Sequence, residues 1–180
     1  MVPEPALLFV GTLYSDAEIF KRSKEIIKKN FGDILLESPS TVWDYSSYYK
    51  NELGWPLFRQ FIFLKNLIDP GILSDFKLKT NEIEDALSSE GKRHINLDPG
   101  YLTLSKIVLA STKNYAHRIY LGKGIYGEVT LSFKDGVYNS HLYTYSDYQD
   151  KMYIDIFMNA RAMLKKMLSV LKDFGLIVQR

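Results

Sequence analysis

Strand-like and helical periodicities alternate along the first 100 residues of this chain, and their order limits the topologies open to it. Residues 6–14 form a continuous apolar run with the length of a buried strand. Residues 19–31 then carry apolar side chains at helical spacing, after Ser15 and Asp16, either of which can cap a helix, and before Gly32, a common helix end. Residues 34–37 are typical of a second strand. The chain therefore begins with the order strand, helix, strand.

The segment 57–68 fits both periodicities, and we favour a strand there because it makes a second half that matches the first. A helix is predicted over 70–88, since Asp69-Pro70-Gly71 is a turn or helix start and Gly91 follows as a stop. Residues 93–97 alternate as a strand. The resulting order, β-α-β-β-α-β, is that of the ferredoxin-like fold, two split βαβ halves on one antiparallel sheet.

The remaining segments predict an extension of this unit. Residues 43–54 are expected to be a strand end running into a loop, 98–100 a turn, and 102–110 either a short helix or a strand. Strands are predicted at 117–121, 125–133 and 137–143, joined by tight turns at 122–124 and at Asp135-Gly136. An apolar stripe over 153–171 predicts a helix that docks on the sheet. We therefore expect one α+β domain over residues 1–180, a ferredoxin-like βαββαβ half extended by a β-hairpin region and a C-terminal helix, on an antiparallel or mixed sheet.

Composition excludes several classes of protein. The chain has no cysteine, which rules out disulfide scaffolds, thiolate nucleophiles, zinc ribbons and cysteine-bound iron–sulfur clusters. No apolar run approaches the roughly 20 residues of a membrane span. The apolar start is too short for a signal peptide and lacks a basic region before it. We expect a cytoplasmic protein without a membrane partner.

Charge is distributed unevenly along the chain. Residues 1–90 carry 10 Lys/Arg against 14 Asp/Glu, whereas residues 91–180 carry 13 against 7. Between Lys92 and Lys123 there are six basic residues and one acid, Asp98. This stretch predicts a basic surface, which either faces solvent or binds an anion such as phosphate, a nucleotide or nucleic acid.

The same stretch holds the candidate catalytic residues His117, Asp98 and Glu128. If the strands around Lys123 pair symmetrically, Arg118 opposes Glu128 and the two can form a salt bridge, which is the purely structural interpretation. The functional interpretation places His117, Asp98 and Glu128 at one cleft. There they could hold a divalent metal such as Mg²⁺ or Mn²⁺, or His117 could act as a general base while Arg118 stabilises negative charge. Both interpretations stay open at this point.

Several basic and aromatic residues around this group are candidates for binding a ligand: Arg93, Lys113, Arg118, Tyr120, Lys123 and Tyr145. The loop Gly122-Lys123-Gly124 is either a hairpin turn or a phosphate contact. The group of Tyr143, Tyr145 and Tyr148 with Asp147 either stacks on a base or sugar or packs under the last helix. The chain has no Walker A motif, no dinucleotide-binding glycine pattern, no G-x-S-x-G and no H-E-x-x-H. No known catalytic motif therefore assigns a reaction.

Four phrases in the chain are not generic: LFVGTLYSD (8–16), KLKTNEIE (77–84), RHINLDPGYLTLSKIVLASTKNYAHRIYLGKGIYGEVTL (93–131) and YTYSDY (143–148). With their spacing, they resemble a family of bacterial proteins catalogued as domain of unknown function 4416, over nearly the whole chain. The resemblance implies a stand-alone bacterial protein of this size, and it brings no established activity, cofactor or catalytic residue. One departure is that the family's last motif usually begins Trp-Thr-Tyr-Pro, whereas this chain has Tyr143-Thr144-Tyr145-Ser146.

Three functions remain compatible with the sequence. The first is an enzyme or binding protein for a small phosphorylated molecule or nucleotide, suggested by the basic stretch with its His and Tyr residues. The second is a scaffold or interaction protein in which the polar cluster is paired internally. The third is an RNA-binding module, for which the isoelectric point of about 8.6 is lower than usual. The oligomeric state and any metal requirement stay open.

Overall fold

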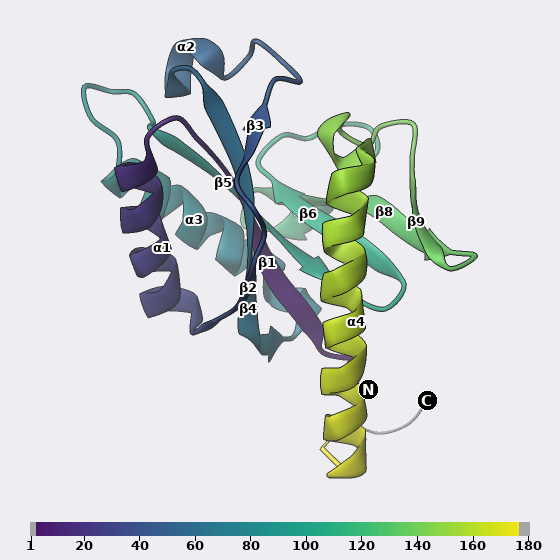
Figure 1. Cartoon of the computed structure of the whole chain (residues 1–180). Coiled ribbons are helices and arrows are strands. Elements are labelled where there is room, and N and C mark those ends of the chain that lie inside the picture. The colour runs from purple at the N-terminus through teal and green to yellow at the C-terminus, as the bar shows by residue number, and fades with distance from the viewer. Residues whose placement is uncertain (1–2, 177–180) are drawn as a thin grey trace.

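A computed structural model describes residues 3–176, which form one nine-stranded sheet with helices on both faces (Figure 1). The strands are β1 (Ala6–Tyr14), β2 (Ile34–Glu37), β3 (Thr41–Trp43), β4 (Leu57–Ile68), β5 (Ile95–Leu102), β6 (Lys106–Ser111), β7 (Ile119–Gly122), β8 (Ile125–Lys134) and β9 (Val137–Ser140). The helices are α1 (Ala17–Phe31), α2 (Lys50–Leu53), α3 (Leu73–Ala86) and α4 (Lys151–Asp173), with short 3₁₀ turns η1 (Pro70–Ile72) and η2 (Asp147–Gln149).

The strands follow the order β2-β4-β1-β5-β6-β8-β7, with β3 paired to β4 and β9 paired to β8. Every one of these pairings is antiparallel among the described residues. The predicted α+β class is confirmed, and so is the strand favoured for 57–68, which is β4. The finer ferredoxin-like description stays a prediction.

Helices α1 and α3 cover one face of the sheet, and α4 crosses the other (Figure 1). Strand β1 lies in the middle and sends alternate side chains to the two faces. Phe9 packs with Phe61 and Phe157 on the α4 side, while Leu8 and Val10 pack on the side of α1 and α3. Because both faces are covered, β1 is buried along its whole length and its sequence is a continuous apolar run.

The sheet splits between β5 and β6. These strands pair only through Gly100, Tyr101 and Leu102, whereas β1 pairs with β5 from Leu102 back to Ile95. The first half of β5 therefore has a strand partner on one side only. An unpaired strand edge inside a protein leaves backbone groups that need other partners.

Two buried side chains of α3 supply those partners. Lys77, which is 6% exposed, donates from Nζ to the carbonyl of Leu97 at 2.9 Å. Glu84, which is 4% exposed, accepts from the backbone N–H of Leu97 at 2.5 Å. The two residues are seven apart and so lie on the same face of the helix. Helix α3 thus replaces the missing strand with charged side chains, and it holds the split open.

Three predictions of local structure are wrong. The turn expected at 98–100 is part of β5, because Asp98, Pro99 and Gly100 all pair with β1. Pro99 cannot donate a ladder hydrogen bond, and it directly precedes the point where the pairing with β6 begins. The loop expected over 43–54 contains α2, which is too short to show a period. Strand β9 ends at Ser140 rather than at residue 143.

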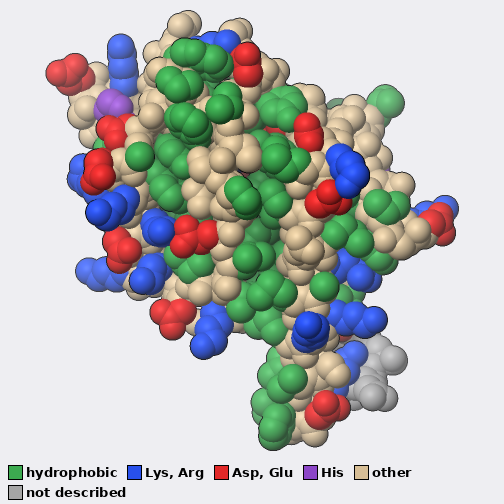
Figure 2. Space-filling model, in the orientation of Figure 1, with side chains coloured by type: hydrophobic (Ala, Val, Ile, Leu, Met, Phe, Trp, Pro, Cys, Tyr) green, Lys and Arg blue, Asp and Glu red, His purple; other side chains and the backbone are tan. Residues whose placement is uncertain are grey.

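Helix α4 runs past the edge of the sheet, so its C-terminal end projects from the body of the molecule (Figure 2). Among residues 3–176, no helix is both long enough and apolar enough to cross a membrane.

Candidate ligand-binding pocket

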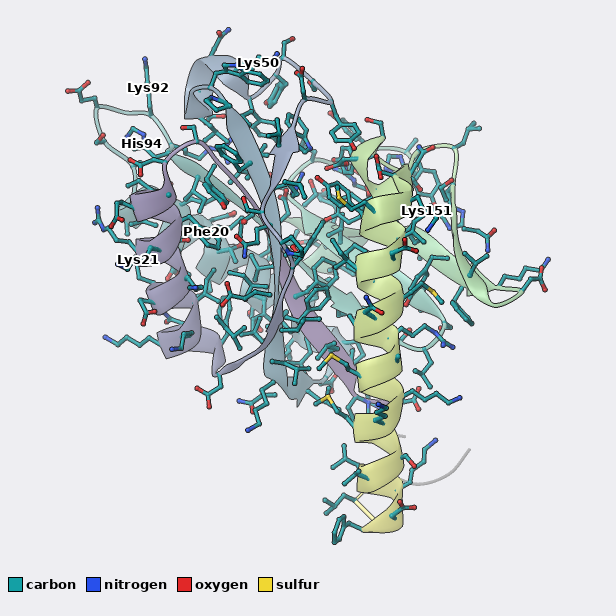
Figure 3. The ribbon with its side chains drawn as sticks, in the orientation of Figure 1. Phe20, Lys21, Lys50, Lys92, His94 and Lys151 are labelled. Carbon is teal, nitrogen blue, oxygen red and sulfur yellow. The ribbon has the colours of Figure 1, made fainter. Side chains whose placement is uncertain are left out.

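A cavity of about 410 Å³ opens where the sheet splits. Its floor comes from β4, β5, β6 and β8, one wall comes from α3, and the opposite wall comes from the segments that precede α2 and α4. It lies at the end of the molecule that carries α2 and the loop before β5, where Lys50, Lys92 and His94 are seen in Figure 3. A volume of this size suits a small organic molecule.

Arg59 of β4 lies deep in this cavity, with 5% of its surface exposed. Its Nη2 donates to Oδ2 of Asp147 at 2.9 Å, and the same oxygen accepts from Nε1 of Trp43 at 2.9 Å. Burial is the largest single influence and lowers the pKa of Arg59, but the neighbouring acidic groups together, Asp147 foremost, outweigh it and hold that pKa above its usual value. The guanidinium group is therefore a fixed positive charge in the pocket.

Not all of the donors of Arg59 are used. Its Nε and Nη1 have no hydrogen-bond partner among the described residues, and neither has the hydroxyl of Tyr148, which is 2% exposed. Buried polar groups are nearly always hydrogen-bonded, since an unpaired one costs about 1–3 kcal/mol. Burial also holds the pKa of Tyr148 well above its usual value, so the hydroxyl keeps its proton. Arg59 and Tyr148 thus have donors to offer to a ligand.

Asp98 of β5 lies beside Arg59 and carries the opposite charge. Its Oδ2 accepts from Nδ2 of Asn96 at 2.6 Å and is 4.0 Å from Nη1 of Arg59, while its Oδ1 is 3.5 Å from Nζ of Lys77. The side chain is 31% exposed. The predicted catalytic residue Asp98 therefore does line the pocket, although β5 holds it there and no turn is present.

Arg93 also lines the pocket, but its donors are occupied. It donates from Nε and Nη2 to Glu52 of α2 at 2.6 and 2.8 Å, and from Nη1 to Glu84 at 2.9 Å and to Asn96 at 3.2 Å. The hydrogen bonds to Arg93 lower the pKa of Glu52. Arg93 ties α2 to α3 and closes one wall, and it has little left for a ligand.

Arg118 and Glu128 form the predicted salt bridge, with Nε 2.7 Å from Oε2 and both side chains 1% exposed. The predicted register is also confirmed, since Ile119 pairs with Gly127 and Tyr120 with Tyr126. Arg118 donates further to Ser111, to the carbonyl of Lys113 and to the hydroxyl of Tyr145. These contacts support the structural interpretation of the pair, which builds the pocket wall that Tyr145 belongs to.

The other predicted residues are placed differently. His117 contacts Glu128 through Nε2 at 2.9 Å and stacks on Tyr143, but it is not among the residues that line the cavity. Lys113 lines the mouth, where its Nζ lies 4.9 Å from the centre of the Tyr48 ring. Tyr120 and Lys123 lie outside the cavity, and Lys123 forms an ion pair with Asp75 of α3.

The three predicted catalytic residues do not gather into a metal site. Within residues 3–176, no three His, Asp or Glu side chains lie close enough together to hold a metal ion. Asp98 and Glu128 both line the cavity, but each is already engaged by cationic side chains of the protein. The pocket is therefore a set of paired charges around a few free donors.

Sequence reasoning missed Arg59 and did not identify Tyr148 as a donor. Arg59 lies inside the segment 57–68, whose pattern predicts only a strand or a helix, and Tyr148 is predicted to stack on a ligand or to pack under the last helix. An arginine in the largely apolar stretch 57–64 is the one signal that could have pointed to Arg59, because charged residues are rarely fully buried without a partner.

A family model described as "Domain of unknown function (DUF4416)" matches residues 4–164 of the chain. The chain belongs to this family. The match spans nearly all the residues that form the DUF4416 fold described above, from β1 through most of α4. The resemblance stated from the sequence motifs is thereby confirmed. No curated protein and no solved structure matches the chain.

Proposed function

We propose that this protein binds a small phosphorylated molecule of nucleotide size in the pocket at the split of the sheet. The observation that carries the proposal is the pair of unpartnered, buried N–H groups of Arg59 inside a cavity of about 410 Å³. Ligand sites in proteins have this size, and they combine hydrophobic walls with a few convergent polar groups.

The aromatic side chains in the walls of the pocket favour a ligand that contains a flat ring. Aromatic side chains line the pocket, among them Trp43, Tyr48, Tyr49 and Tyr145. Figure 2 shows hydrophobic side chains gathered at the end of the molecule where α2 and β3 lie, and Val42, Tyr48 and Trp55 there are more than half exposed. Aromatic side chains of this kind stack on planar groups.

A lysine at the mouth of the pocket favours a ligand that carries a phosphate group. Lys113 forms no ion pair within residues 3–176, so its ammonium group is available to an anion, unlike Arg93 and Arg118. The proposal concerns binding. Catalytic roles for His117, Asp98 and Glu128 stay predictions, as does the cytoplasmic location.

A thermal-shift screen of the full chain tests the proposal, with nucleotides, sugar phosphates and short RNA, each with divalent metal or EDTA. At a ligand concentration 100 times the Kd, the folded state gains roughly 2.7 kcal/mol, which raises the Tm by several degrees. We expect Lys113→Ala to reduce the response to phosphorylated compounds, while Lys134→Ala, an exposed lysine at the end of β8, leaves it unchanged. No response to any phosphorylated compound would refute the proposal.

A further inference from the structure

The inner end of the pocket offers a ligand a specific set of donors and acceptors. Nε and Nη1 of Arg59 and the hydroxyl of Tyr148 lack partners among residues 3–176. Asp98 contributes a carboxylate, which can accept more hydrogen bonds than the one it receives from Asn96. The inner end therefore combines unused donors with an adjacent acceptor.

Gly11 of β1 lies directly against these donors. A methyl group at this position would come within 3.2 Å of Nη1 of Arg59, 3.2 Å of the hydroxyl of Tyr148 and 3.3 Å of the Phe61 ring, closer than ordinary contacts. The two polar atoms therefore lie near each other over the backbone of β1, and a glycine is what lets them do so.

The charges around these donors balance. The cations Arg59 and Lys77 face the carboxylates of Asp98 and Asp147, at distances from 2.9 to 4.0 Å. A further anion buried among them would have no compensating charge, and an uncompensated buried charge is strongly unfavourable. The group bound at the inner end is therefore uncharged, and a phosphate belongs at the mouth.

The distance between the Arg59 donor and the Asp98 acceptor indicates what kind of uncharged group fits at the inner end. Nη1 of Arg59 and Oδ2 of Asp98 lie 4.0 Å apart, beyond the hydrogen-bond range of about 2.7–3.2 Å, so they do not satisfy each other. Placed side by side, they match a planar edge that has an acceptor next to a donor. Nucleobases present such edges, as with a ring carbonyl beside an N–H, or a ring nitrogen beside an amino group.

We propose that the inner end of the pocket recognises the acceptor–donor edge of a nucleobase. Arg59 and Tyr148 donate to the acceptor of the edge, and Asp98 accepts from its donor. The phosphate of the nucleotide then points to the mouth, toward Lys113. This inference rests on the proposed function, and it names the part of the ligand that enters the pocket first.

Isothermal titration of the full chain with three classes of compound tests the inference: nucleosides, their 5′-monophosphates and ribose 5-phosphate. We expect at least one nucleoside to bind, its monophosphate to bind more tightly, and ribose 5-phosphate to bind more weakly than either. Tyr148→Phe removes one neutral hydrogen bond to the ligand and should weaken nucleoside binding about 2- to 10-fold. Gly11→Ala presses a methyl group against Arg59 and the Tyr148 hydroxyl, displaces both donors and should weaken binding as well.

Tyr138→Phe is the matched control, because Tyr138 is also 2% exposed but belongs to β9, where it pairs with Phe133 of β8, outside the pocket. It should leave every affinity unchanged. If ribose 5-phosphate binds as tightly as the nucleotides and both pocket variants bind normally, the inference is wrong while the proposed function stands. Binding of nucleosides without any gain from phosphate supports the inference and contradicts the phosphate part of the function. If nothing in the three classes binds, both are wrong.

Discussion

Replacing Glu128 by leucine should strongly destabilise the folded protein, because it leaves the Arg118 charge buried without its partner. The two side chains are each 1% exposed, and their charged atoms are 2.7 Å apart. At that distance their gross attraction is roughly 6 kcal/mol for an effective dielectric constant of about 20, and desolvation offsets most of it in the intact pair. Once Glu128 is gone, the desolvation cost of Arg118 stays and only neutral acceptors remain. We expect a loss of about 3–5 kcal/mol in the free energy of unfolding.

The double variant Arg118→Met with Glu128→Leu separates this cost from the net contribution of the ion pair to the free energy of unfolding. It removes both charges and fills the site with apolar groups of similar length, so it should lose less than half of what Glu128→Leu loses. Urea denaturation of the wild type, both single variants and the double variant supplies the four free energies of unfolding. The coupling energy follows from them as a double-mutant cycle.

The reasoning fails if the costs of the two single changes simply add in the double variant. Additive costs would mean that Arg118 and Glu128 act independently, despite their contact. A double variant that binds ligand normally would further show that this pair supports the wall and does not contact the ligand.

Two other predictions concern stability. Burial raises the pKa of Glu84 above its usual value, so the native state holds more protons than the unfolded state just above pH 4.5, and the stability contributed by this group falls as pH rises through that window. Glu84→Gln should therefore flatten the dependence of unfolding free energy on pH in the range just above 4.5, and an unchanged slope there would contradict the argument. Asp16 caps α1 by accepting from the backbone N–H of Glu18 at 2.7 Å. Asp16→Ala should cost about 1 kcal/mol in urea denaturation, whereas the exposed Glu25→Ala should cost much less.

Much of the fold could be predicted because apolar residues recur in the sequence at the spacing of a helix or a strand. Strand β1, helix α1 and helix α4 are long and carry one clear pattern each. The turn expected at Asp98-Pro99-Gly100 shows the limit of such reasoning, since these residues are common in turns yet lie in a strand here. Pairing with β1 overrides the local preference, and a strand partner 80 or more residues away in sequence leaves no local signal.

In the site, too, contacts between residues close in sequence could be predicted, and contacts between residues far apart in sequence could not. Arg118 and Glu128 lie on either side of one hairpin, so their contact follows from a register that the turn defines. Arg59 and Asp147 are 88 residues apart and meet only because η2 packs against β4. A buried N–H is a free donor when no acceptor lies within hydrogen-bond distance of it in the folded structure. A sequence pattern cannot show that such an acceptor is missing.

The pocket follows from how the sheet is built, and it is not a gap left by poor packing. Lys77 and Glu84 satisfy the backbone of Leu97 from the side where β6 would otherwise pair. If β6 closed onto the first half of β5, it would take those backbone groups, and each of the two buried charged side chains would lose its hydrogen bond to Leu97. The open split is therefore the state in which the charges of α3 are satisfied. Since the same split places Arg59 and Asp98 around one cavity, the residues that hold the sheet apart also position those we propose to bind the ligand.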